Sequence, residues 1–447
     1  MAVKIQPDGY FEITYKDFDG GLNVQQPESE IADNETPGAN NFQTRNKELR
    51  SRPAFSLKFP GPRNDPVLGL YSFIDANNVT HTVCWDSSGL WQLAATPGRP
   101  WAQLGAPSMV AGNPVSYRAF VNQLYYCNGG TTLAYWDGIA TAPVASGVDV
   151  NGNPIALTTS VASVTAADAP DVIAGTTGPL SIGGLFLSEL DNHLLMANIN
   201  VIDNGTGTIY NFPNRLWWSA NGIPTMWDFE ANLNAGFNDF LDVPDVITGL
   251  ATTGVSGYIF RTNGITFFDP TGNGNAPFQF DHLWAAEHGV GNVYPWSIAF
   301  YGAIGFFISV EQIYRMGVTD FEPIGGNARD AIMADLANAS AQPVCSVVPT
   351  ENLGYIYFTY RISIPLTTFT RVYVYEAETK KWNAPWDVPA LIQTGRCEEV
   401  WTGLLAALPI GAIPAGTASQ GGGGNQGGSG PSQPPSPKGG SKGGPTF

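Results

Sequence analysis

Short runs of alternating apolar and polar residues recur along most of this chain. One run, Gly257–Thr266 (GYIFRTNGIT), carries Asn263-Gly264 near its centre. Asn-Gly between two β-rich runs predicts a tight hairpin, because both residues tolerate a positive φ. Without gaps, its apolar positions match those of Thr82–Trp91 and of Gly305–Tyr314. The chain is therefore expected to repeat one β-hairpin unit.

A fourth copy begins at Tyr125 and reaches Leu133. Superposing Cys84 on Cys127 and Leu90 on Leu133 gives a period of about 43 residues, which is typical of propeller blades. Each unit lacks a second apolar layer, and units packed face to face would supply it. The pattern predicts an all-β fold, a β-propeller of about five or six blades, because a two-sheet sandwich does not explain six similar units. The predicted units are residues 67–95, 115–138, 185–228, 245–285, 293–325 and 344–390.

Three regions depart from the repeat. Residues 1–55 are predicted to form an extended N-terminal arm with a strand at Tyr10–Phe18, and Val24–Arg50 is predicted to be an extended segment packed on something else. Residues 139–182 are rich in Ala, Thr, Val and Ser, and they are predicted to be a rim insertion in a propeller of residues 56–405. Residues 406–447 are predicted to be a flexible, disordered tail, because a Gly/Pro/Ser-rich segment cannot bury apolar area.

One segment, Asn327–Ser340, has helical spacing instead. Ile332, Leu336 and Ala339 recur as they would on one face of a helix. Asn327 is expected to cap this helix, since Asn side chains accept hydrogen bonds from the first backbone N–H groups.

Composition narrows the classes of function. The 447 residues carry a formal net charge of −17, and only 13% of them are charged. A protein that holds nucleic acid needs a surplus of Lys and Arg, so that class is excluded. An acidic surface repels DNA, so the negative net charge suits a tube that conducts DNA without holding it. A requirement for solubility alone also explains this charge. The first residues do not form a signal peptide, and no apolar run is long enough to predict a membrane span.

Candidate chemistry is sparse. Asp281, His282, Glu287 and His288 could form a metal cluster, but their spacing fits no known ligand pattern and a structural role explains them as well. Residues Asp269–Asp281 resemble a calcium loop only superficially, because acidic residues at alternate positions and a closing Glu are missing. The Gly-x-Ser-x-Gly motif of hydrolases is also missing. We assign no catalytic, cofactor-binding or metal site and no cofactor, and we expect a non-enzymatic protein.

Cysteines and tryptophans are both expected in the core. The four cysteines form neither a CxxC pair nor a zinc spacing, so small buried hydrophobic side chains in a reducing cytoplasm are expected. They are Cys84, Cys127, Cys345 and Cys397. Tryptophans could line a sugar-binding surface, but four lie in strand runs, where an inter-blade core is expected. These four are Trp85, Trp217, Trp218 and Trp296.

Several short motifs of the arm occur together in one known family. They are Phe18–Asn23, Pro27, Ile31–Glu35, Asn40-Asn41 and Leu49–Pro53. Three later segments are similar to the middle of the same proteins: Arg215–Ser219, Pro224–Trp227 and Ile247–Leu250. On these residues the chain resembles the tail nozzle proteins of short-tailed bacteriophages, also called tail tubular protein B or packaged-DNA stabilisation proteins. The resemblance covers most of residues 10–390.

The resemblance implies a structural subunit of the virion tail, made in the host bacterial cytoplasm. Such propellers assemble as a ring of six, a homohexamer, below the adaptor ring. They form the distal channel for double-stranded DNA, retain packaged DNA until ejection, and contact tail fibres or a needle. This chain is shorter than the larger nozzles, which add β-domains, and its Gly-rich tail matches no part of the family. We expect Asn232–Asp242 or residues 139–182 to form a loop constriction that blocks leakage of DNA.

Two alternatives stay open from the sequence. The first is a phage-tail propeller that recognises or depolymerises surface glycans, which the aromatic content of 12% favours. Binding or digestion of a polysaccharide by the purified protein would separate it from the nozzle. The second is a cellular propeller scaffold, for which gene neighbourhood is the discriminating observation.

Overall fold

The computed structural model describes most of the chain between residues 2 and 389. The described residues are 2–5, 11–14, 20–27, 29–32, 35–36, 42–45, 48–51, 67–87, 89–93, 101–105, 110, 113–130, 133–138, 180–203, 206–227, 234–242, 245–282, 289–317, 320–339, 343–350, 355–363, 369–377, 379–383 and 385–389. Most of the predicted insertion, residues 139–179, and the predicted tail, residues 406–447, lie outside them.

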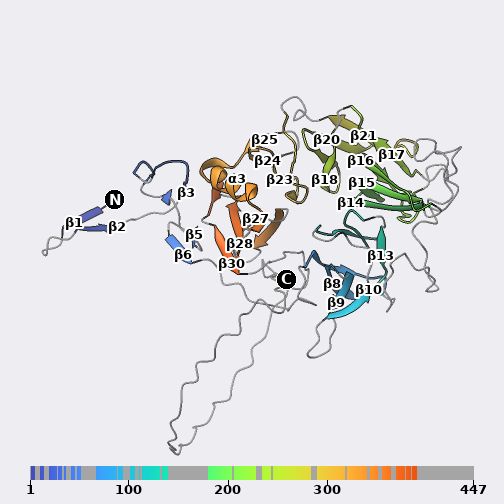
Figure 1. Cartoon of the computed structure of the whole chain (residues 1–447), viewed down its shortest axis with the longest axis horizontal. Coiled ribbons are helices and arrows are strands. Elements are labelled where there is room, and N and C mark those ends of the chain that lie inside the picture. Colours follow the sequence, from blue (N-terminus) through green and yellow to red (C-terminus); the bar gives the residue numbers. More distant parts are fainter. Residues whose placement is uncertain are drawn as a thin grey trace, which may run out of the picture. The chain divides into compact units, whose positions relative to one another are not determined.

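Six antiparallel sheets follow one another along the described chain, and each is built from strands that are adjacent in sequence (Figure 1). The first sheet holds β7 (Gly69–Ile74), β8 (Thr80–Asp86), β9 (Gly89–Leu93) and β10 (Trp101–Gly105), and the second holds β11 (Ser116–Phe120), β12 (Gln123–Cys127) and β13 (Ala134–Trp136). The third holds β14 (Leu180–Leu190), β15 (His193–Asp203), β16 (Ile209–Trp218) and β17 (Gly236–Asp239).

The remaining three sheets repeat this order. The fourth holds β18 (Ile247–Thr252), β19 (Gly257–Arg261), β20 (Ile265–Pro270) and β21 (Phe278–His282). The fifth holds β22 (Ala299–Tyr301), β23 (Ile304–Ile308), β24 (Ile313–Met316) and β25 (Phe321–Pro323). The sixth holds β26 (Val344–Thr350), β27 (Tyr355–Ser363), β28 (Phe369–Glu376), β29 (Lys381–Trp382) and β30 (Trp386–Pro389), and both β29 and β30 pair with β28.

Apolar side chains on both faces of the second to fifth sheets bury each of them between its two neighbours. In β19, Tyr258 and Phe260 pack with Phe307 of the fifth sheet. Ile259, which lies between them, packs with Leu195 of the third sheet, because successive side chains of a strand point to opposite faces. Apolar clusters of this kind join each sheet to the next from the first to the sixth. The protein is all-β, and its sheets are the blades of a β-propeller.

The packing corrects one of the predicted equivalences between repeats. Trp85 packs toward the second sheet, whereas Cys84 packs on the opposite face of the first sheet. Cys127 packs toward the third sheet, so it corresponds to Trp85 and not to Cys84. The superposition of the two cysteines was wrong by one residue, and a shift of one residue places every side chain of the strand on the opposite face of the sheet. Leu90 and Leu133 do face the same way, toward the next sheet, so the turn before Leu133 holds the extra residue.

Three strand segments lie beyond the predicted units. β10 completes the first sheet after residue 95, and β17 completes the third sheet after residue 228. β14 begins at Leu180, so residues 180–182 belong to the third sheet and not to the predicted insertion. The outermost strands escaped detection because they are short and Gly- or polar-rich, which weakens the alternating pattern.

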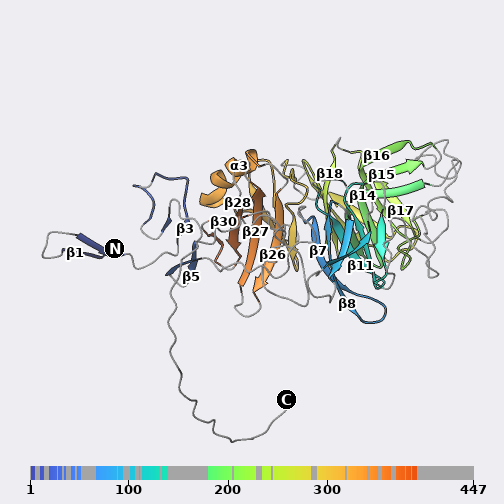
Figure 2. The ribbon, with the colours of Figure 1, turned by 60° about the horizontal axis from the view of Figure 1, so that its bottom comes forward.

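A helix lies between the fifth and sixth sheets, beside β28 (Figure 2). It consists of the 3₁₀ turn η3 (Gly326–Ala328) and the α-helix α3 (Arg329–Ala337). Ile332 and Leu336 are buried as predicted. The predicted cap was wrong: Ala328 occupies the N-cap position, and the side chain of Asn327 bonds to the arm instead.

The arm contains three short strand pairs. β2 (Phe11–Thr14) lies within the strand predicted at Tyr10–Phe18, and it pairs with β1 (Ala2–Ile5), which the pattern had not predicted. β3 (Gly21–Leu22) and β4 (Glu35–Thr36) pair in parallel, and β5 (Phe42–Arg45) and β6 (Glu48–Ser51) pair antiparallel. Among the helices of the described residues, none is long and apolar enough to cross a membrane.

Candidate functional site

The predicted hairpin at Gly257–Thr266 is present, but its turn is held from outside. β19 and β20 pair on either side of Thr262 and Asn263, and neither Asn263 nor Gly264 adopts a positive φ. The carboxylate of Asp245 accepts hydrogen bonds from the backbone N–H groups of Thr262 at 3.1 Å and Asn263 at 2.7 Å. A residue that comes before the fourth sheet therefore fixes the turn.

Asp245 belongs to a connector, residues 239–246, that joins the third sheet to the fourth. Asp239 at its start accepts two hydrogen bonds from Arg215, both of 2.6 Å. Asp242 accepts one from Arg261 at 3.1 Å. Both arginines are only 1% exposed. A buried guanidinium that keeps its charge requires such partners, so the connector is fixed at three positions.

Aromatic rings enclose the first of these ion pairs. The guanidinium carbon of Arg215 lies 4.1 Å from the ring centre of Phe212 and 4.0 Å from that of Phe237. Phe240 of the connector is buried in the cluster between the third and fourth sheets. The described part of the segment Asn232–Asp242 thus contains the strand β17 and a bonded connector, so the prediction that the whole segment is a loop was wrong. Whether the segment constricts a channel stays a prediction.

The connector nevertheless exposes apolar side chains. Leu241 is 74% exposed and Val246 is 43% exposed. Exposed large hydrophobic side chains are of interest where they cluster, because clustered patches mark interaction sites. Here two of them occur within six residues on a rigid support. This feature carried no sequence signal, since Leu241 interrupts a polar run without any period.

The arm is anchored over the fifth and sixth sheets by an apolar contact. Leu22 is 5% exposed and packs in the cluster that contains Ile324, Tyr375 and Trp382. Gly21 has a φ of +79°, and a Cβ there would lie 2.8 Å from the carbonyl oxygen of Trp382. Only glycine suits such a close approach at positive φ. Gly21 and Leu22 therefore attach the arm to the end of the sixth sheet.

Polar contacts complete this anchor. The carboxylate of Glu35 accepts hydrogen bonds from the Asn23 amide at 2.7 Å and from the Asn327 amide at 3.3 Å. The backbone N–H of Val24 donates to the carbonyl of Asn327 at 3.1 Å. The arm therefore binds the turn that leads into α3.

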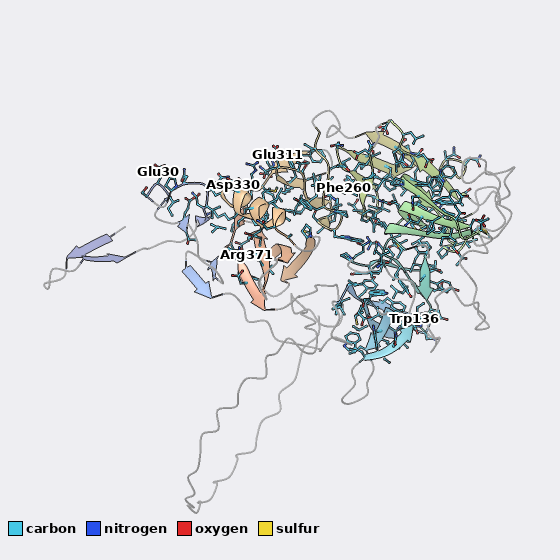
Figure 3. The ribbon with its side chains drawn as sticks, in the orientation of Figure 1. Glu30, Trp136, Phe260, Glu311, Asp330 and Arg371 are labelled. Atoms are coloured by element: carbon cyan, nitrogen blue, oxygen red, sulfur yellow. The ribbon has the colours of Figure 1, made fainter. Side chains whose placement is uncertain are left out.

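A second ion-pair network holds α3 on the sixth sheet. Arg371 of β28, labelled in Figure 3, donates to Asp335 at 3.0 Å and to Asp387 at 2.9 Å. The Tyr373 hydroxyl donates to the same Asp335 oxygen at 2.7 Å. Burial opposes the charge of Arg371, but the two carboxylates outweigh it and raise its pKa. Each member of this network bonds Arg371 or Asp335, so the network links α3 to β28 and β30.

The predicted metal cluster is only partly described. Asp281 and His282 lie on β21, whereas Glu287 and His288 lie outside the described residues. The turn of residues 271–277 satisfies its own polar groups: Thr271 accepts from the backbone of Asn273, and Asn273 accepts from that of Asn275. Within the part of the chain that the structure describes, no three His, Cys, Asp or Glu residues are arranged to hold a metal.

Two buried histidines have structural partners. His81 lies 3.1 Å from Asp75 and 2.9 Å from the Gln92 amide, which ties the first three strands of the first sheet together. The backbone N–H of Val79, together with His81, lowers the pKa of Asp75. His193 bonds the carbonyl of Ser219 at 2.6 Å, and burial lowers its pKa.

The described cysteines are buried, as predicted. Cys84, Cys127 and Cys345 carry free thiols. Burial raises the pKa of Cys84 well above its ordinary value and that of Cys127 to about 12. Thiols in this state are poor nucleophiles, because the thiolate is the reactive form. Cys397 lies outside the described residues.

Tryptophans do not form an exposed surface in the described part of the chain. Trp85 and Trp217 are 0% exposed and Trp218 is 7% exposed, as the prediction of an inter-blade core required. Trp296 is partly buried against the cluster of the third and fourth sheets. Trp136, labelled in Figure 3, is 1% exposed. These rings contribute to packing between blades and leave no stacking platform for a sugar among them.

Charge is distributed unevenly along the sequence. Residues 67–317 contain 18 Asp or Glu and 5 Lys or Arg, and no lysine occurs between Lys58 and Lys380. Two of the five basic residues are the buried Arg215 and Arg261, and Arg315 pairs with Glu322 at 3.1 Å. Of the other two, Arg118 is half-buried and donates to the Ser188 hydroxyl at 3.4 Å, and Arg99 lies outside the described residues. The excess of acidic residues over basic ones disfavours phosphate binding along this stretch.

Comparisons with known proteins give distant structural similarity only. No protein-family model and no curated protein matches the chain. PorZ, a bacterial surface component of the type-IX secretion system of Porphyromonas gingivalis, is 11% identical with a TM-score of 0.38, and the match covers 77% of this chain but 37% of PorZ. The AfRom2 CNH domain is 9% identical with a TM-score of 0.37, covering 77% of this chain and 92% of the domain. The Dos1 propeller is 12% identical with a TM-score of 0.30, and the match covers 62% of this chain and 60% of the Dos1 chain.

Proposed function

We propose that this protein is a structural, non-enzymatic subunit of the tail nozzle of a short-tailed bacteriophage. Several copies would form a ring below the tail adaptor, with a channel for double-stranded DNA. The arm motifs and the propeller fold support this proposal. The observation that carries it is the charge pattern: residues 67–317 are strongly acidic and free of lysine, and three of their five arginines form ion pairs within the chain.

The mechanism that we propose is geometric and electrostatic. An acidic channel surface repels the phosphates of DNA. DNA gains no free energy from counterion release on such a surface, so it does not bind there and can move through the ring. Ion pairs at Arg215 and Arg261 fix the connector between two blades, which suits a wall that keeps its shape. The candidates for a constriction that retains packaged DNA are the segment Asn232–Asp242 and the predicted insertion at residues 139–182.

Cryo-electron microscopy of the virion is the direct test. The expected result is a ring of this chain, with six copies, around the DNA path at the end of the tail, in contact with the adaptor above and with fibres or a needle. Finding the chain on the fibres, away from the DNA path, would overturn the proposal. Purified protein should also leave duplex DNA unshifted in an electrophoretic assay at low salt, where phosphate contacts are strongest.

The glycan-recognition alternative is less well supported. It depends on aromatic rings that face solvent, and every described tryptophan is buried or partly buried. Binding or cleavage of a host polysaccharide by the purified protein would restore this alternative. The nozzle proposal expects neither activity.

A further inference from the structure

The connector carries two exposed apolar side chains in the described structure. Leu241 and Val246 are 74% and 43% exposed. Their neighbours in sequence, Phe240 and Ile247, are only 3% and 0% exposed. These two buried side chains anchor the backbone, which directs Leu241 and Val246 outward. We call Leu241, Val246 and the flanking Asp242 the connector patch.

The connector patch is rigid before any partner arrives. Asp239 and Asp242 bond buried arginines, and Asp245 bonds three backbone N–H groups. A preorganised surface loses little conformational freedom on binding, so more of the contact energy remains as affinity. Exposed apolar side chains in a stretch with 18 acidic and 5 basic residues, 67–317, fit a partner segment that combines apolar and basic residues.

The chain contains one segment of that composition. Residues 42–63 hold six Lys or Arg and a single acid, Glu48. Apolar residues lie between the basic ones: Leu49, Phe55, Leu57 and Phe59. Part of this segment forms the pair β5 and β6. It is the most basic stretch before the first sheet, whereas residues 67–317 are acidic, so the two parts of the chain are complementary in charge.

A second copy is the better source of this segment than the same copy. The arm residues before it are anchored beside α3 and β29, next to the sixth sheet, and the residues after it enter the first sheet. The connector patch lies between the third and fourth sheets, in the middle of the series. Both ends of the basic segment are thus tied to sheets two places away from the patch in its own chain.

We infer that the connector patch of one copy binds the basic segment, residues 42–63, of a neighbouring copy. Leu241 and Val246 contact the apolar side chains of the segment, and Asp242 faces its basic side chains. The inference names the contact between copies within the proposed ring, and in that sense it rests on the proposed function. Because each copy offers both the patch and the segment, the contact is head-to-tail, and it forms a ring when the rotation between copies closes.

Cross-linking of mixed isotopic copies tests this contact in the full-length protein. A photoreactive amino acid replaces Leu241 in a copy labelled with ¹⁵N, and this copy is mixed with unlabelled protein. The expected products join residue 241 of the labelled copy to a peptide from residues 42–63 of the unlabelled copy. Cross-links confined to one copy, or cross-links to another region, would overturn the inference.

Paired substitutions provide the second test. Leu241→Asp and the triple change Arg50→Glu, Arg52→Glu, Lys58→Glu should each weaken association at least about tenfold, a loss of about 1.4 kcal/mol, measured by analytical ultracentrifugation. The matched control is Val255→Asp, since Val255 is equally exposed at 74% but lies beyond the opposite end of β18. Circular dichroism of each variant checks that the sheets remain folded.

The outcomes separate the inference from the proposed function. If Leu241→Asp and the triple variant assemble like the control, and the ring is present in tails, the contact is wrong and the function stands. If the unmodified protein stays monomeric and is absent from the DNA path of the virion, both fail. Weaker association of both variants at moderate salt, with Val255→Asp unchanged, supports the contact.

Discussion

The buried ion pair of Arg215 and Asp239 offers a quantitative test of the rigid connector. Asp239→Asn keeps the shape of the side chain but removes its charge, so it leaves a guanidinium that is 1% exposed without its carboxylate. Arg215→Met keeps much of the volume between Phe212 and Phe237 and removes the positive charge. The two changes thus remove the same interaction from opposite sides.

The two changes should differ in cost. Removing one partner of a buried pair costs about 3–5 kcal/mol, because the remaining charge stays desolvated. Asp239 is 24% exposed, so water can reach the vacated side, and we expect about 3 kcal/mol for Asp239→Asn. Arg215→Met removes the cation–π contacts and leaves behind only the carboxylate of Asp239, which is the more exposed partner. We therefore expect this variant to lose about 1–2 kcal/mol of unfolding free energy. The double variant should resemble Arg215→Met alone.

Urea unfolding monitored by tryptophan fluorescence measures this double-mutant cycle. The midpoint should fall most for Asp239→Asn, and adding Arg215→Met should recover part of the loss at an unchanged slope. Additive losses, or a loss below about 0.5 kcal/mol for Asp239→Asn, would show that the carboxylate does not compensate the buried charge. The account of the fixed connector would then be incorrect.

Three further predictions follow from the packing. Gly257→Ala should destabilise the fourth sheet by more than about 2 kcal/mol in the same assay, because a Cβ would lie 2.0 Å from the Phe268 ring; an unchanged midpoint would contradict this packing. Burial lowers the pKa of His193 in the folded protein below its value in the unfolded chain, about 6.5. The free energy of unfolding should therefore be constant above about pH 6.5 and decrease as the pH falls from there toward the folded pKa. His193→Gln should flatten that part of the pH profile of the unfolding midpoint. Iodoacetamide should leave Cys84 and Cys127 unmodified in the folded protein and label both in urea, as read by mass spectrometry; rapid labelling of the folded protein would show that the sheets open.

The repeat was predictable because burial on two faces leaves a strong pattern. In Gly257–Thr266 and Gly305–Tyr314, alternate apolar residues point to opposite neighbours, so a gapless superposition preserved every face. The superposition through Cys84 and Cys127 failed because the second sheet has a longer turn. An extra residue in a turn shifts the alignment of the flanking strands between repeats. The apolar pattern within each strand stays the same, so it does not reveal the length of the turn.

The connector was not predictable for a different reason. Its order depends on partners far away in the sequence: Asp242 needs Arg261, and Asp245 needs the turn at Asn263. A polar run that contains Gly and Asn is typical of a free loop when it is considered alone. Asn327 illustrates the same limit, since the local rule assigns its side chain to a helix cap while the folded chain uses it to hold Glu35.

The anchoring of Leu22 beside Trp382 has a consequence for the biogenesis of the molecule. A ribosome that adds about 5–20 residues per second needs roughly 20–70 seconds to reach Trp382 after it has made Leu22. The blades can form in order as they emerge, whereas the arm has no binding site until nearly all of them exist. Docking of the arm is therefore the last tertiary event for these residues, and a chain that ends before Trp382 would display Leu22 to solvent.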